Sequence, residues 1–125
     1  MLPRTGDGED EESTVKYLML VCVDPTGEPV ENSTGDASAM DWVTEMDSRG
    51  VRVLGERVRP PGDAVAVRVR GGELRVTKGP FAETTEHIAG FDVLECADLE
   101  EAIEVAGRHP MARYGALELR EFWAD

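Results

Sequence analysis

The chain has 125 residues, and its 26 acidic and 13 basic side chains give a formal net charge of −13. This surplus of acid argues against generic nucleic-acid binding, which depends on Lys and Arg neutralising phosphates, and against docking on anionic lipid. The length fits one domain, and 41% hydrophobic residues suffice for a core. No stretch approaches the roughly 18 apolar residues that span a membrane, and no export signal is evident, so we expect a cytoplasmic protein.

The amino-terminal segment and the two cysteines set further expectations. Residues 1–14 are rich in acid and glycine, which predicts a disordered acidic tail ahead of a single domain over residues 15–125. Cys22 and Cys96 both lie in apolar, strand-like runs. Two buried free thiols in a reducing compartment are the simplest interpretation, and a disulfide between adjacent strands is the alternative.

The first half of the domain predicts two strands around a helix. Residues 15–23 are apolar at both odd and even positions, as in a central strand covered on both faces. Residues 36–49 predict a helix that ends at Gly50. Residues 51–58 predict a strand with Val51 and Val53 on one face and Arg52 and Leu54 on the other. The helix should bury one set of side chains, namely Ala39, Trp42, Val43 and Met46.

Gly71-Gly72 provides the clearest local signal. Two β-patterned runs, residues 64–70 and 73–78, flank this pair, and adjacent glycines supply the positive φ values of a two-residue hairpin turn. One face of the hairpin should carry Val65, Val67, Val69, Leu74 and Val76. The opposite face should carry Arg68, Arg70 and Arg75.

The second half predicts a strand over residues 91–96, a helix and a last strand over residues 116–122. Asp98 followed by Glu101 has the spacing of a capping box at the start of the helix, and Pro110 should stop it. His109 is then a helix-end residue. The expected buried stripe consists of Leu99, Ala102, Ile103 and Ala106.

With the hairpin set aside, the predicted order is βαββαβ. We therefore predict an α+β fold of the ferredoxin-like type, with two helices on one face of an antiparallel sheet and an inserted β-hairpin. The other face of the sheet would carry apolar side chains without intrachain cover. A second subunit is the usual remedy, so we expect a homodimer.

Two stretches resemble a known family. Residues 77–84 (TKGPFAET), followed by residues 88–91 (IAGF), are similar to the signature of the DGPF, or YCII-related, proteins, and the flanking elements agree over residues 15–123. The resemblance implies a dimeric α+β barrel with a pocket between sheet and helices. In a shorter branch of the family the candidate site is an early His–Asp pair, whereas this chain has only His87 and His109, and Lys78 replaces the acid of the signature.

Chemistry-bearing side chains are concentrated between Lys78 and His87. Glu83 lies four residues before His87, so a helical turn would place the carboxylate beside the imidazole, the standard arrangement of a general base. Lys78, Glu83 and His87 are therefore the candidate catalytic residues, and Gly79, Pro80 and Phe81 would shape a ligand-binding loop. The alternative is a purely structural turn in which Phe81 anchors the loop.

Arginines form a second candidate site. Residues 52–78 hold seven basic side chains against three acidic ones. If Arg68 and Arg70 point into a cleft, they would bind a small anionic ligand through bidentate contacts. The alternative is a charged outer face of the sheet. The two histidines and two cysteines do not have metal-ligand spacing, and no cofactor motif is present, so we expect neither metal nor cofactor.

These observations favour a small-molecule-binding homodimer with cofactor-free acid–base activity of the lyase or isomerase type. Whether it is an enzyme stays open at this point. One alternative is a non-catalytic ligand sensor or a regulatory partner of a sigma factor, because some similar proteins are encoded beside extracytoplasmic-function sigma factors. Another is a degenerate subunit of a hetero-oligomer, which Lys78 in place of the signature acid would suit.

Overall fold

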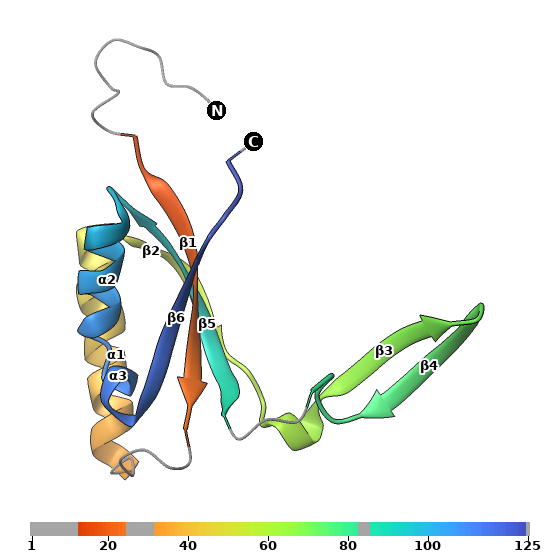
Figure 1. Ribbon diagram of the computed structural model, residues 1–125. Coiled ribbons are helices and arrows are strands. Elements are labelled where there is room, and N and C mark those ends of the chain that lie inside the picture. Colours follow the sequence, from red (N-terminus) through yellow and green to blue (C-terminus); the bar gives the residue numbers. More distant parts are fainter. Residues whose placement is uncertain (1–12, 25–31, 83–85, 125) are drawn as a thin grey trace.

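The computed structural model describes residues 13–24, 32–82 and 86–124. A four-stranded antiparallel sheet carries helices on one face, and a two-stranded hairpin projects away from the other (Figure 1). The predicted acidic tail lies outside the described residues, except for Ser13 and Thr14. None of the described helices is both long and apolar enough to cross a membrane.

The sheet confirms the predicted ferredoxin-like α+β fold. The strands lie in the order β2-β5-β1-β6, so the two central strands are β1 and β5. Their bounds are β1 Val15–Val23, β2 Arg52–Arg57, β5 His87–Cys96 and β6 Gly115–Glu121. The helices are α1 Asn32–Arg49, α2 Leu99–Gly107 and the short α3 Met111–Tyr114. β1-α1-β2 and β5-α2-β6 form the two halves of the fold, and the hairpin is inserted between β2 and β5.

The core lies between the sheet and the helices. Every second residue of β1 points into this core, namely Tyr17, Met19 and Val21, because successive side chains of a strand point to opposite faces. Helix α1 begins at Asn32, four residues earlier than predicted, and buries Trp42 and Met46 as expected. The Trp42 indole donates a 2.9 Å hydrogen bond to the Val105 carbonyl and so joins α1 to α2. Gly50 has φ +73, as its predicted cap position requires.

Helix α2 buries a different stripe from the predicted one. Ala102 and Ala106 are buried as expected, but Leu99 and Ile103 are 51% and 55% exposed, so the prediction was wrong for these two residues. Val105 is fully buried in their place. Helix α2 is rotated about its axis so that Val105 points into the core, because the helix packs against both the sheet and α1.

A register irregularity in β2 overturns the predicted faces of that strand. The pairing with β5 shifts between Arg52 and Leu54. Arg52 lies opposite Leu94 on the helix side, whereas Leu54 lies opposite Val93 on the other side. Val51 is buried but Val53 is 48% exposed, so simple alternation fails here. A bulge of this kind depends on the neighbouring strand and leaves no signal in the local pattern.

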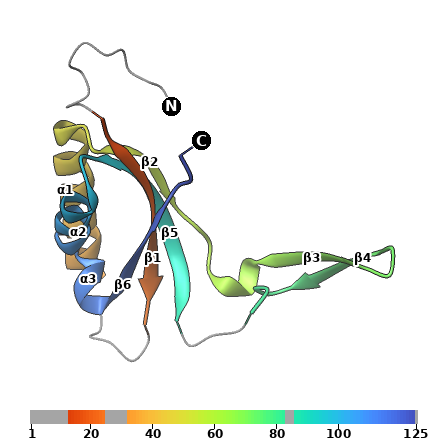
Figure 2. The ribbon, with the colours of Figure 1, turned by 45° about the horizontal axis from the view of Figure 1, so that its top comes forward.

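The predicted Gly-Gly hairpin is confirmed. Strands β3 (Val65–Arg70) and β4 (Glu73–Lys78) pair around Gly71 and Gly72, whose φ values are +60 and +80. They form a separate two-stranded sheet that stands away from the main one (Figure 2). We call residues 65–78 the arm. A short 3₁₀ turn, Pro61–Asp63, leads into it.

Replacing Asp98 with Ala should lower the free energy of unfolding by about 1 kcal/mol, the usual cost of losing a helix N-cap. The Asp98 carboxylate accepts a 2.9 Å hydrogen bond from the Glu101 N–H, and the Glu101 carboxylate accepts one of 2.7 Å from the Ala97 N–H. The capping interaction is therefore formed as predicted. Urea unfolding measures the loss. Glu100→Ala, in the same turn but outside the cap, is the control, and an equal loss in both variants would contradict the assignment.

Candidate functional site

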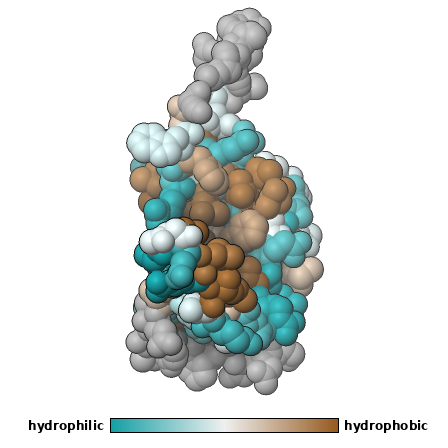
Figure 3. All heavy atoms as spheres, turned by 90° about the vertical axis from the view of Figure 1, so that its right-hand side faces the viewer, coloured by the Kyte–Doolittle hydropathy of each residue, from teal (hydrophilic) through white to brown (hydrophobic). Residues whose placement is uncertain are grey.

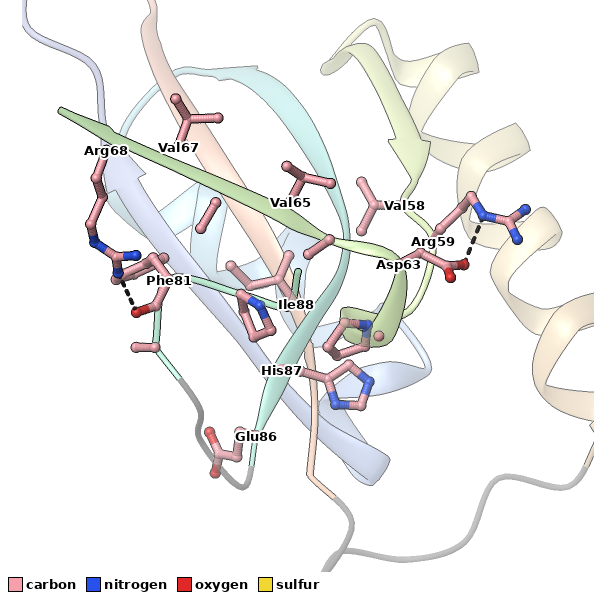
Figure 4. Close-up of a pocket in the computed structure, with 17 residues that line it drawn as sticks. Val58, Arg59, Asp63, Val65, Val67, Arg68, Phe81, Glu86, His87 and Ile88 are labelled. Carbon is pink, nitrogen blue, oxygen red and sulfur yellow. Dashed lines mark hydrogen bonds and ion pairs between the residues drawn. The ribbon is translucent and has the colours of Figure 1, made fainter. Parts of the chain in front are cut away.

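An open hollow of about 1040 Å³ lies at the base of the arm. Residues from five segments line it: the chain after β2, the 3₁₀ turn, the first half of the arm, the loop of residues 79–82 that follows the arm, and the start of β5 (Figure 4). Most of the wall is apolar, with Val58, Val65, Val67, Phe81 and Ile88 as its larger side chains. A hollow of this size, mostly apolar with a few polar groups, has the character of a small-molecule site.

Backbone hydrogen bonds fix the shape of the base. The Gly79 N–H donates to the Ala64 carbonyl over 2.7 Å and ties the two ends of the arm together. Gly79 has φ +100, a conformation that strains any other residue. The Val58 N–H donates to the Ala89 carbonyl over 2.8 Å, which holds the chain leading to the arm beside β5. The hollow is therefore bounded by backbone that the main sheet and the arm both position.

Two arginines and one histidine are the basic groups in the wall. One Nη of Arg68 donates a 3.1 Å hydrogen bond to the Phe81 carbonyl, while Arg59 pairs with Asp63 over 2.9 Å. Figure 4 shows these arginines on opposite sides of the hollow, with His87 between them in this view. The bond to Phe81 uses one donor of the Arg68 guanidinium, whose planar fork can bind an anion with the others.

The residues nominated from the sequence divide into three groups. Gly79, Pro80, Phe81, Arg68 and His87 all line the hollow. Lys78 and Arg70 belong to the arm but do not line it. Glu83 lies outside the described residues.

The position of His87 corrects one expectation about this segment. His87 is the first residue of β5, which begins four residues before the predicted strand. Residues 83–85 lie outside the described residues, so the pairing of the Glu83 carboxylate with the His87 imidazole stays a prediction. The hydrogen bonds and ion pairs of the described residues include none that involves the His87 imidazole.

The predicted arginine cluster does not form one cleft. The guanidinium of Arg52 lies on the helix side of the sheet, 2.8 Å from the Asp92 carboxylate. Arg70 donates to the carbonyl of its neighbour Val69. Arg68 and Arg59, both members of the basic stretch of residues 52–78, are the arginines in the wall.

Sequence reasoning missed Val58, Arg59 and Ile88 as lining residues. The Pro60-Pro61 break directly after Arg59 was the available signal, because a firm turn places the residues before and after it around one corner. Ile88 stands inside the family-like stretch, ahead of the predicted strand over residues 91–96, and the structure places it in β5 and in the wall of the hollow.

The resemblance placed a pocket between the sheet and the helices, and the structure fills that layer with core side chains. A smaller hollow of about 370 Å³ lies at the helix ends, lined among others by Trp42, Glu45 and Arg108. Arg108 and Glu45 pair across 2.7 Å, so the charges at its mouth neutralise one another. The hollow at the arm base is therefore the better candidate site.

The cysteines are free, as predicted, and the disulfide alternative is excluded. Cys96 pairs with Val15 at one end of β1 and Cys22 pairs with Ile88 near the other, so the thiols lie far apart. Burial raises the pKa of Cys96 to about 11 and also raises that of Cys22. Both are therefore protonated at neutral pH and poor nucleophiles. Among the described residues, no cluster of three or more His, Cys, Asp or Glu could hold a metal ion.

Comparison with known proteins gives the family. The model of the YCII-related domain matches residues 15–124, and the chain belongs to this family. An uncharacterised protein of Rhizobium meliloti is 44% identical over 80 residues, which cover 52% of this chain. The match spans about 64% of that relative's length.

Proposed function

We propose that the protein is a homodimer that binds a small molecule with an apolar body and one anionic group at the base of the arm. The observation that carries this proposal is the position of Arg68 in a mostly apolar hollow of about 1040 Å³. The Val65, Val67 and Ile88 side chains offer an apolar surface, and the unused donors of the guanidinium offer an anion site.

The homodimer follows from the face of the main sheet that the helices leave uncovered. We call this the open face. By the register of the strands it carries Leu18, Leu20, Leu54, Phe91 and Val93. Apolar side chains gather on this side of the molecule (Figure 3). An apolar face of this extent usually marks a protein interface, and a second copy is the partner that is always present.

Binding can be tested with 2-naphthoate, an aromatic carboxylate of the proposed kind. Its addition should shift the backbone NMR signals of residues around the hollow, such as Arg68 and Ile88. Arg68→Met should weaken binding about tenfold, because a hydrogen bond between charged groups is lost. Arg75→Met is the matched control, since Arg75 lies directly opposite Arg68 in the arm but does not line the hollow. Equal weakening in both variants, or shifts confined to other surfaces, would overturn the site.

His87 supplies the chemistry of the catalytic form of this proposal. The His87 imidazole in the wall can act as a base that takes a proton from an acidic C–H of a bound ligand and returns it. Phenylpyruvate, an aromatic 2-oxo acid, has such a C–H. In D₂O the protein should accelerate deuterium incorporation at that carbon, and His87→Ala should abolish the acceleration while 2-naphthoate still binds.

A non-catalytic ligand sensor is the second candidate, and one observation favours it. No described residue orients the His87 imidazole through a hydrogen bond, and such an orienting partner is usual for a general base. Tight binding of aromatic carboxylates without deuterium exchange would select the sensor.

A further inference from the structure

The arm has two chemically different faces. Register places Val67 opposite Val76 and Val69 opposite Leu74, so these side chains share one face with Val65. All five are 58–68% exposed. Arg68 lies opposite Arg75 on the other face, together with Arg70. Lys78, opposite Val65, stands at the base of the apolar face.

An exposed apolar face is unexpected on an isolated hairpin. A two-stranded sheet is marginally stable in water unless its apolar side packs against something. Here the arm stands away from the main sheet, and its apolar face is not covered by the described part of the chain (Figures 1 and 2). The apolar face therefore needs a partner.

Charge identifies that partner. The arm carries Arg68, Arg70, Arg75 and Lys78 against one acid, Glu73, so its net charge is +3 in a chain of net charge −13. Two such acidic chains repel each other at long range, whereas a basic arm placed on an acidic partner is attracted by its opposite net charge, although the three arginines lie on the face of the arm turned away from the contact. A second copy of this chain has the complementary charge.

The available surface is large enough for that pairing. The five apolar arm side chains, with Leu54, Val58, Phe81, Ile88 and Phe122 on the same side of the main domain, are all strongly exposed. Together they present on the order of 1,000 Å² of surface per copy, the scale of a stable protein–protein interface.

We propose that the arm of each copy packs its apolar face on the open face of the second copy, and that this exchange completes the ligand site. In a single chain the hollow is walled by the base of the arm and the start of β5, and Phe81 at its edge is 81% exposed. The partner then covers the side that one chain leaves open. This inference rests on the small-molecule site proposed above, and it couples ligand affinity to dimerisation.

Three variants of the full chain separate the arm from the site. Val76→Asp places a charge on the apolar face of the arm at a position that does not line the hollow. Thr77→Asp adds the same charge on the next residue, on the opposite face, and is the matched control. Arg68→Met changes the hollow itself. Sedimentation velocity gives the dimer dissociation constant of each, circular dichroism confirms that each is folded, and NMR titration gives the affinity for 2-naphthoate.

We expect Val76→Asp to weaken the dimer at least tenfold and to weaken 2-naphthoate binding with it. Thr77→Asp should change neither constant by more than about twofold, because surface substitutions away from packed features have small effects. Arg68→Met should weaken binding of the probe and leave the dimer intact.

The outcomes distinguish this inference from the proposed function. A folded Val76→Asp variant that dimerises like wild type, or a wild-type chain that is monomeric at millimolar concentration, overturns the arm exchange. A monomeric Val76→Asp variant that binds 2-naphthoate as tightly as wild type overturns the shared site and leaves the small-molecule site standing. If wild type dimerises through the arm but binds no probe at the hollow, the proposed small-molecule function fails and so does the shared site.

Discussion

Replacing Arg52 with Met should lower the free energy of unfolding by about 3–5 kcal/mol at pH 7, because it leaves a buried carboxylate without its cation. Asp92 is 6% exposed, and its Oδ1 accepts a 2.8 Å hydrogen bond from the Arg52 Nε. Arg52 also donates to the Asp47 carboxylate and the Gly55 carbonyl. The single guanidinium therefore holds α1, β2 and β5 together at one point.

The pH dependence of this variant tests the cause. Burial raises the pKa of Asp92 in the folded protein, while Arg52 acts in the opposite direction. A raised folded-state pKa means that the charged form is disfavoured by folding, so this group costs stability as pH rises above the ordinary carboxyl range. Without Arg52 the pKa rises further. The loss relative to wild type should therefore be largest at pH 7 and clearly smaller at pH 4.

Urea unfolding of both proteins at each pH measures this difference. Adding Asp92→Asn to the Arg52→Met variant removes the buried charge and should recover part of the stability at pH 7. A loss that is the same at pH 4 and pH 7, with no recovery in the double variant, would show that lost packing rather than the uncompensated charge is responsible.

Acidification should destabilise the protein through His109, by about 3 kcal/mol between pH 6.5 and pH 4. His109 is 8% exposed, its ring meets the Trp42 indole edge-on, and its Nδ1 accepts the Met111 N–H. Burial lowers the pKa of His109 to about 4. In this pH range the unfolded chain binds a proton that the folded chain does not, so stability falls as pH falls through it.

His109→Asn isolates this contribution, because the Asn side-chain oxygen can still accept the Met111 N–H. The variant should be less stable than wild type at pH 7 but show a flatter decline toward pH 4. Carboxylates contribute to acid destabilisation in both proteins, so the measured quantity is the difference between the two unfolding curves across pH. Parallel curves would mean that His109 does not carry the effect.

Features set by adjacent residues were predictable from the sequence. The Gly71-Gly72 turn requires positive φ, Asp98 and Glu101 form a cap across three residues, and the apolar run of residues 15–23 marks a strand, although the helices cover only one of the two faces that were expected to be covered. Each depends on local chemistry, and these together with the alternating strands led to the correct fold class.

Features set by contacts between distant elements were not predictable. The bulge in β2 arises where Arg52 meets Asp92, forty residues away in the chain. The rotation of α2 follows from its packing on Trp42. For the candidate site, the stretch around Phe81 that the sequence singled out lines the hollow at the base of the arm. Its other wall, with Arg59 and Ile88, follows from the path of the chain into the arm; the Pro60-Pro61 pair indicates a turn there but does not specify which segment the turn faces.

The arm forms its strand pairings within itself, and this has an evolutionary consequence. Because its ladder does not continue into the main sheet, residues can be inserted or deleted near the Gly-Gly tip without changing the core. Adding two residues to each strand would lengthen the arm by about 7 Å and keep every side chain on its face, whereas adding one would exchange the faces beyond the insertion. Selection on relatives of this chain can therefore vary the length of the arm in steps of residue pairs while the domain that supports it stays the same.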